Sequence, residues 1–221
     1  MSAGDHKIEQ TDFRKGAIAL LPLITKGIVV TTNFDCVLEK GFAQNNSAFE
    51  SVISGPRPDL IVDALHGNKK TLIKLHGDWQ DRVGRTFSKA DYESNYGDEN
   101  IDSKNKKREL LISSEELIFS SRSLLFIGAS LSADRTVNVL KNIHEKYAGI
   151  RYFAILNIPM NESQLDETKF NEVSKRIKAY GIIPIWYKAT SPNQHNLGVE
   201  RRLKRIIEEL STSSFTTNCT T

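Results

Sequence analysis

The chain has 221 residues, of which 30 are Lys or Arg and 27 are Asp or Glu, giving a net charge of +3 at pH 7. A chain of this length can bury one sizeable core, so we expect one domain. The small, evenly spread charge gives no indication of nucleic-acid binding. The two cysteines, Cys36 and Cys219, cannot build a disulfide framework or a zinc ribbon, and so low a cysteine content is typical of the reducing cytoplasm.

Short apolar runs rich in β-branched residues recur along the chain and predict strands. The runs are GIVVTT at 27–32, TLIKL at 71–75, SLLFI at 123–127, YFAIL at 152–156 and IIPIWY at 182–187. Because apolar residues continue without polar alternation, both faces of each strand are expected to be covered. The segment GAIALLPLIT at 16–25 is expected to be a core helix rather than a signal peptide, since acidic residues precede it. No apolar run is long enough to cross a bilayer, so we expect a soluble, cytoplasmic protein.

Stretches with a helical period of apolar residues lie between and after these runs. The apolar positions are Val137, Leu140, Ile143 and Tyr147, then Phe170, Val173, Ile177 and Tyr180, and finally Leu203, Ile206, Ile207 and Leu210. Gly181 is expected to end the second of these helices. Strands that alternate with helices predict a Rossmann-like, doubly wound α/β domain with a parallel sheet.

Two segments depart from this alternation. Residues 88–122 are polar and charged, and we expect a helical insertion or a flexible lid there, with the KNKK run at 104–107 as a solvated face. The segment from 211 to 221, STSSFTTNCTT, has little to bury and is expected to be a disordered tail. The predicted domain therefore covers residues 1–210.

Polar residues follow three of the predicted strands. They are Thr32, Asn33 and Asp35 after the first, His76 after the second, and Gly128, Ser130 and Asp134 after the third. In an open parallel sheet, ligands bind in the crevice at the carboxyl ends of the strands, so we expect these clusters to face one crevice. Small residues at 128–130 allow a backbone to approach a ligand closely, and a serine hydroxyl can bind a ribose or a phosphate.

His76 is the strongest candidate for proton transfer, because a neutral imidazole can accept a proton from water or a ribose hydroxyl. A histidine at a strand end is more often structural, but Asn33 in the same predicted crevice favours the catalytic interpretation. His66, in LHGN, lies outside a clear strand end and ranks below His76. Asp134 can cap the following helix or contact the ligand, and the sequence leaves both open.

The motifs TTNFD, KLHGD and FIGASLSAD, in this order, resemble the sirtuin-like domain of prokaryotic NAD hydrolases, in the branch that occurs in anti-phage defence proteins. The resemblance implies that NAD is the substrate, that the bond between nicotinamide and ribose is cleaved and that no metal is needed. It implies that Asn33 orients the attacking water or the nicotinamide ribose and that His76 is the general base.

The same resemblance implies supporting roles for the other candidate residues. Asp35 is expected to buttress the asparagine loop, Thr32 to contact NAD, and Gly128, Ser130 and Asp134 to hold the adenosine half. The family begins with a strand and a glycine-rich loop that binds pyrophosphate at a helix N-terminus, and no such motif precedes Asn33 here. Three interpretations stay open: a truncated copy, a fragment of a longer gene product, or a site completed by a second chain or an upstream segment.

These observations leave more than one function open. The favoured function is NAD hydrolysis in anti-phage defence, and the alternative is a catalytically inactive nucleotide-binding or regulatory remnant that binds NAD or ADP-ribose. A zinc-ribbon protein deacylase is disfavoured because the chain has too few cysteines. A metal-dependent phosphoesterase is disfavoured because HGN and HGD lack companion ligands at other strand ends. No membrane or nucleic-acid partner is indicated, and an oligomer is open.

Overall fold

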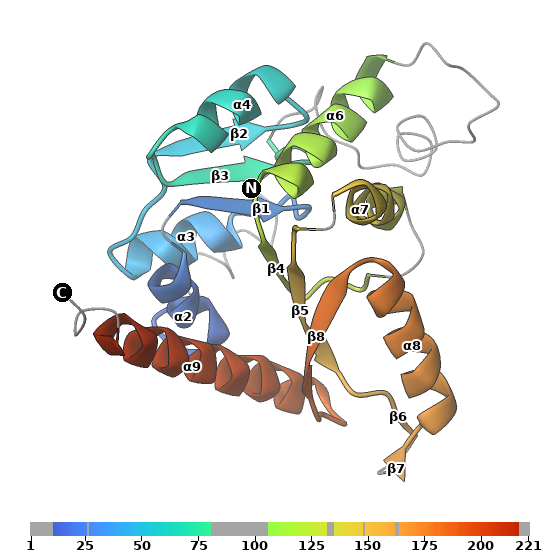
Figure 1. The fold of residues 1–221 in the computed structure, drawn as a ribbon. Helices are drawn as coiled ribbons and strands as arrows, with labels where there is room; N and C mark the ends of the chain where they lie inside the picture. Colours follow the sequence, from blue (N-terminus) through green and yellow to red (C-terminus); the bar gives the residue numbers. More distant parts are fainter. Residues whose placement is uncertain are drawn as a thin grey trace.

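The computed structural model describes residues 11–25, 27–80, 106–131, 135–147, 149–161 and 164–216. The strands are Ile28–Thr31 (β1), Ser51–Ser54 (β2), Thr71–Lys74 (β3), Leu124–Ile127 (β4), Tyr152–Asn157 (β5), Met160–Asn161 (β6), Gln164–Leu165 (β7) and Ile182–Tyr187 (β8). The helices are Gly16–Ile24 (α2), Val37–Gln44 (α3), Pro58–His66 (α4), Lys106–Ser121 (α6), Arg135–Lys146 (α7), Glu167–Ala179 (α8) and Pro192–Thr216 (α9). This alternation of strands and helices confirms the α/β prediction (Figure 1).

The larger strands form two parallel sheets of three strands each. Their orders are β1-β3-β2 and β4-β5-β8, and β6 and β7 form a separate antiparallel pair. In Figure 1 the strands of the first sheet run across the upper part of the molecule and those of the second run down the lower part. Strand β2 is not among the strands predicted from the sequence, and its presence makes β3 the central strand of the first sheet.

The central position of β3 explains why all four of its residues are buried. Ile73 belongs to the main core, together with Ile61 of α4 and Ile118 of α6. Successive side chains of a strand point to opposite faces, so Lys74 points away from this core and toward the face covered by α3. The strand therefore delivers a lysine into the interior on the side of the sheet where α3 begins.

The described helices agree with the apolar periodicity of the sequence. In α7, Val137, Leu140 and Ile143 are buried in the main core. Asp166 caps the N-terminus of helix α8, where its carboxylate accepts a hydrogen bond from the Lys169 amide at 3.0 Å. The helix ends before Gly181, where φ is +70° and a Cβ would lie 2.3 Å from Nδ1 of His144.

Helices α9 and α6 overlap two segments for which the sequence predicts a tail and an insertion. Helix α9 continues to Thr216, beyond the expected boundary at residue 210, while residues 217–221 lie outside the described part. Of the expected insertion at 88–122, helix α6 is described and residues 88–105 are not. Within the described residues, no helix has the length and apolar character needed to cross a membrane.

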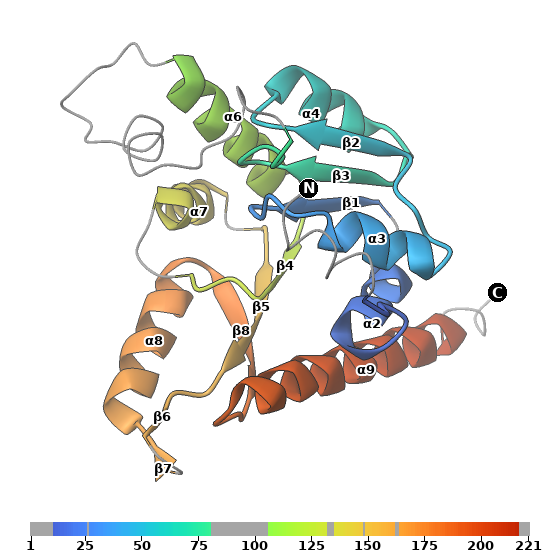
Figure 2. The same ribbon diagram turned by 180° about the vertical axis from the view of Figure 1, so that it is seen from behind.

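Helix α2 packs between other helices on the lower side of the first sheet. It contacts α9 and α3, and both views of the ribbon place it beside them (Figures 1 and 2). The approach to α3 is close, because a Cβ at Gly41 would lie 2.5 Å from Cγ1 of Ile18. All side chains of α2 are apolar, yet none is fully buried, and Leu23 is 62% exposed. The expected helix before the first strand is therefore present, with half-buried side chains.

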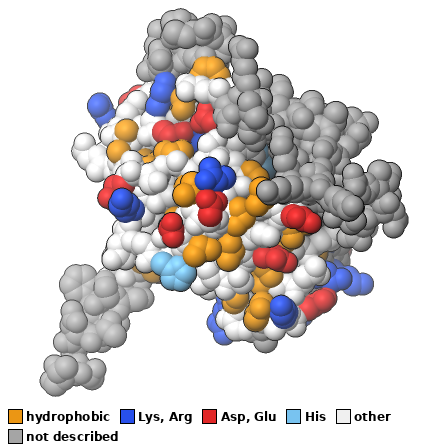
Figure 3. Space-filling model, turned by 90° about the horizontal axis from the view of Figure 1, so that it is seen from above, with side chains coloured by type: hydrophobic (Ala, Val, Ile, Leu, Met, Phe, Trp, Pro, Cys, Tyr) orange, Lys and Arg blue, Asp and Glu red, His pale blue; other side chains and the backbone are white. Residues whose placement is uncertain are grey.

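The face seen from above in Figure 3 carries side chains of mixed character. Hydrophobic side chains gather in a band across the middle of the described surface, and acidic and basic side chains border it. Among the described large hydrophobic residues, Val52 of β2 and Leu60 of α4 are exposed. This mixture agrees with the nearly balanced composition.

Tyr152→Phe is expected to lower the free energy of unfolding by about 1–3 kcal/mol, because the buried Phe119 carbonyl loses its donor. In the native chain the Tyr152 hydroxyl donates to that carbonyl at 2.7 Å, and burial raises its pKa to about 12. The neutral hydroxyl therefore contributes stability below the unfolded pKa of about 10, and this contribution is lost as pH rises toward the folded value. Urea unfolding at pH 7 and pH 11 measures both effects.

Tyr147→Phe is the matched control, since Tyr147 is exposed at the end of α7. Equal stabilities of the two variants at pH 7 would contradict the role of the Tyr152 hydroxyl.

Candidate functional site

The loops after β1 and β3 leave the first sheet side by side. Thr31 pairs with Lys74 in the parallel register of these strands. The Leu75 amide then donates to the Thr31 carbonyl at 3.0 Å, which continues the pairing past the strand ends. Residues 32–35 and 75–78 therefore start from neighbouring points at the carboxyl edge of the sheet.

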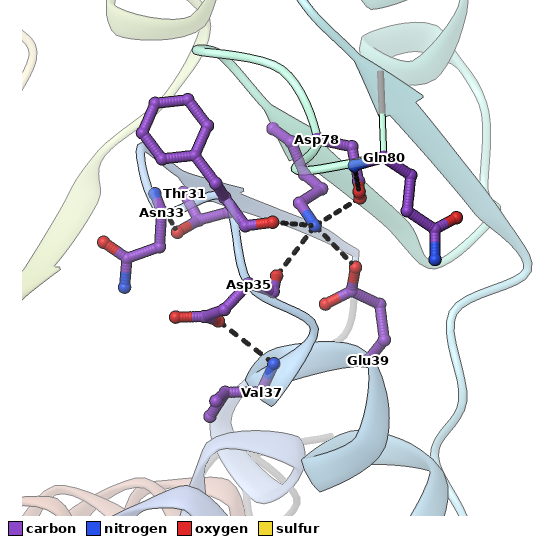
Figure 4. Close-up of polar contacts among 9 residues, drawn as sticks. Thr31, Asn33, Asp35, Val37, Glu39, Asp78 and Gln80 are labelled. Atoms are coloured by element: carbon purple, nitrogen blue, oxygen red, sulfur yellow. Dashed lines mark hydrogen bonds and ion pairs between the residues drawn. The ribbon is translucent and has the colours of Figure 1, made fainter. Parts of the chain in front are cut away.

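Hydrogen bonds between residues two positions apart fix the path of the β1 loop. The Asn33 amide donates to Oγ1 of Thr31 at 3.0 Å, and the Val37 amide donates to Oδ1 of Asp35 at 3.1 Å. Both are turns in which a side chain binds the backbone two residues ahead. Asp35 thus holds the first turn of α3, while Thr32 and Asn33 are exposed. In Figure 4 the Asn33 side chain points away from Glu39 and Asp78.

The β3 loop turns back at once and contacts the β1 loop. Gly77 adopts a φ of +90°, which glycine reaches without strain, and its amide donates to the Lys74 carbonyl at 2.9 Å. The half-buried His76 ring lies with its centroid 6.3 Å from that of Phe34. The Trp79 amide donates to the Phe34 carbonyl at 3.2 Å. The structure therefore brings the two predicted catalytic residues, Asn33 and His76, into loops that are bonded to each other.

The buried amine of Lys74 contacts both of these loops. Its Nζ lies 3.3 Å from the Phe34 carbonyl and 2.7 Å from the Asp35 carbonyl, both in the β1 loop. It also lies 2.9 Å from Oε1 of Glu39 on α3 and 2.5 Å from Oδ2 of Asp78 in the β3 loop (Figure 4). The Lys74 side chain is 0% exposed.

The charge of Lys74 is stabilised by its partners. Burial by itself lowers the pKa of Lys74, but hydrogen bonds to Asp78 and Glu39 and their negative charges outweigh burial and raise the pKa above its ordinary value. The amine therefore stays protonated at neutral pH. Lys74 and Glu39 were not among the residues predicted for the site, although a lysine inside the apolar run TLIKL is a usable signal, because a fully buried lysine is almost always paired.

The third predicted cluster belongs to the second sheet. Gly128 and Ser130 follow β4 and are exposed. Gly128 has a φ of +69°, and a Cβ there would meet no atom of the described residues within 4 Å. Asp134 lies outside the described residues. His66, ranked below His76 from the sequence, is exposed at the end of α4, where its Nδ1 lies 2.8 Å from the Val62 carbonyl of its own helix.

The exposed groups of these loops offer hydrogen bonds and accessible backbone. Asn33 offers an amide that both donates and accepts hydrogen bonds, Thr32 and Ser130 offer hydroxyls, and Gly128 offers accessible backbone. These groups suit ribose hydroxyls and phosphate oxygens. Lys74 has no such role, because its amine is buried and engaged by four protein oxygens.

Comparison with known proteins gives one family. A family model described as a SIR2-like domain matches residues 27–185. This range begins just before β1 and ends within β8, so it includes the loops that carry Asn33, His76 and Ser130. A search of curated proteins finds no significant match.

Proposed function

The chain belongs to the SIR2-like domain family, whose members bind NAD, and we propose that it hydrolyses the bond between nicotinamide and ribose in NAD. The observation that carries this proposal is the direct bonding of the Asn33 loop to the His76 loop at the ends of adjacent parallel strands. An exposed amide and a half-buried imidazole on bonded loops suit a reaction that must orient one water and accept one proton.

The proposed reaction converts NAD and water into nicotinamide, ADP-ribose and a proton. The bond from the ribose carbon to nicotinamide breaks, its electron pair leaves with nicotinamide, and positive charge develops on the ribose, as in glycoside cleavage generally. Water forms the new bond to the ribose carbon and gives up a proton. Asn33 orients the water or the nicotinamide ribose, and His76 accepts the proton.

The remaining predicted residues have supporting roles in this proposal. Asp35 holds the Asn33 loop against the start of α3, and its hydrogen bond to the Val37 amide supports that role. Thr32 contacts NAD beside Asn33. Gly128, Ser130 and Asp134 hold the adenosine half, and the lack of described atoms within 4 Å of a Cβ at Gly128 supports close approach of a ligand to that loop.

We place this reaction in anti-phage defence. The support is the likeness of TTNFD, KLHGD and FIGASLSAD to the defence branch of the family.

The proposed reaction needs no metal ion, since oxygen and nitrogen groups of the protein suffice to position water and accept a proton.

Asn33→Ala is expected to lower nicotinamide release from NAD by roughly 100-fold, because loss of positioning at the reacting bond has effects of that size. Release is followed chromatographically with the purified full chain, and NAD binding is measured in parallel by calorimetry. Asn171→Ala is the matched control, since Asn171 is an exposed asparagine on α8, and it should keep wild-type turnover.

Each outcome of this experiment decides between the alternatives. Tight binding of NAD or ADP-ribose without nicotinamide release would favour a catalytically inactive nucleotide-binding protein. Release that survives Asn33→Ala unchanged would overturn the role assigned to Asn33.

A further inference from the structure

We propose that Lys74 is a positioning residue, which holds the Asn33 loop and the His76 loop in the relative arrangement that the reaction requires. This inference rests on the proposed NAD hydrolysis. Lys74 itself does not touch the substrate in this proposal, because its side chain is fully buried beneath the two loops.

The contacts of Lys74 come from three separate elements. Two are backbone carbonyls directly after Asn33, at Phe34 and Asp35. One is the carboxylate of Asp78, two residues after His76, and one is the carboxylate of Glu39 on α3. A single ammonium group therefore ties the loop of each predicted catalytic residue to the other and to the helix that follows the first.

The two carbonyl contacts make this arrangement more than an ion pair. A carbonyl position is set by the backbone, so a bond to it constrains the loop itself rather than a flexible side chain. The Asp35 carbonyl, at 2.7 Å, is the shorter of the two contacts, and the Asp35 side chain simultaneously binds the Val37 amide. Residue 35 is thus held through its backbone and its side chain.

Glu39 supports the assignment from the side of α3. Its Oε1 binds Lys74, whereas its Oε2 is buried and has no hydrogen-bond partner among the described residues. Burying a carboxylate oxygen without a partner is unfavourable. The pairing of Oε1 with the Lys74 ammonium group offsets part of this cost.

Positioning can be distinguished from a purely structural role by where the effect appears. A residue that only stabilises the fold changes the melting temperature but leaves kcat unchanged at temperatures well below it. A residue that sets the distance between two catalytic groups lowers kcat in the fully folded protein, since a misplacement of about 1 Å can lower the rate roughly 100-fold.

The test compares Lys74→Met with Lys204→Met. Methionine has a similar length and removes every hydrogen bond of the amine. Lys204 provides the matched control because it forms an ion pair with Glu200 at 2.6 Å on the surface of α9. At a temperature where circular dichroism shows both variants folded, we expect Lys74→Met to lower kcat about 100-fold and to change KM far less. Lys204→Met should keep the wild-type kcat.

If Lys74→Met does not fold, Glu39→Gln tests the same positioning role of Lys74. It retains the size of the side chain and an acceptor oxygen while removing one of the two charges that face Lys74. The expected result is a several-fold fall in kcat with an unchanged fold. A wild-type kcat in Glu39→Gln, or in folded Lys74→Met, would overturn the positioning role.

A measurement without NAD separates this inference from the proposed function. Amide hydrogen exchange, resolved by NMR, should accelerate at Asn33, Val37 and Trp79 in Lys74→Met and stay at wild-type rates in Lys204→Met. If the wild-type protein releases no nicotinamide, the proposed hydrolysis fails, and the exchange rates still decide whether Lys74 holds the loops. Unchanged exchange in Lys74→Met would refute that.

Discussion

His76→Ala is expected to lower kcat for nicotinamide release by about 10²–10⁴-fold, the range that a general base contributes. The half-buried ring of His76, in the β3 loop, lies beside Phe34 of the β1 loop. The β3 loop should keep its path in this variant, because its turn depends on Gly77 and on backbone hydrogen bonds. NAD affinity should therefore change much less than kcat.

Steady-state kinetics and calorimetry of His76→Ala measure the two effects separately. His66→Ala is the control, since His66 is exposed on α4 and bonded within its own helix. In cells challenged with phage, wild-type protein should reduce plaque number and His76→Ala should not. A variant kcat close to wild type would show that another group accepts the proton.

Phe42→Ala is expected to lower the free energy of unfolding by about 3–5 kcal/mol, as for other large aromatic residues removed from a core. Phe42 is 0% exposed on α3, and its ring stacks on Phe49 with the centroids 4.4 Å apart. It lies outside the main core cluster, on the side of the first sheet that α3 covers. Its removal therefore weakens the packing that places Glu39 beneath the site loops.

Urea unfolding of Phe42→Ala, followed by circular dichroism, measures this loss. Leu23→Ala is the control, because Leu23 is largely exposed on α2, and such surface changes stay within about 0.5 kcal/mol. A loss for Phe42→Ala no greater than that for Leu23→Ala would show that α3 is not anchored through this ring.

The apolar runs of the sequence located five of the six strands in the two parallel sheets. These strands could be predicted because a strand that is covered on both faces is a continuous run of β-branched and apolar residues. Strand β2 was missed because Ser51–Ser54 carries serines at both ends and only Ile53 is fully buried. The division into two sheets depends on which strands pair, and periodicity along the chain carries no information about pairing between distant segments.

The sequence predicted those candidate site residues that directly follow a predicted strand. Asn33 and His76 were identified because each follows a predicted strand, and strands β1 and β3 do lie next to each other. Lys74 and Glu39 were missed because their significance lies in a contact between residues 35 positions apart. Glu39 alone looks like an ordinary surface residue of a helix. Whether Gly128, Ser130 and Asp134 bind the ligand stays a prediction.

The packing of α2 against α9 joins a segment that is synthesised early to a segment that is synthesised much later. Helix α2 leads into β1, which Asn33 follows, and α9, residues 192–216, packs against α2. A ribosome synthesises α2 well before α9, so the side of α2 that contacts α9 lacks its cover until almost all of the described chain has been translated. An apolar segment near the start of the described chain is therefore exposed during most of the synthesis of that chain, when it can bind other apolar surfaces.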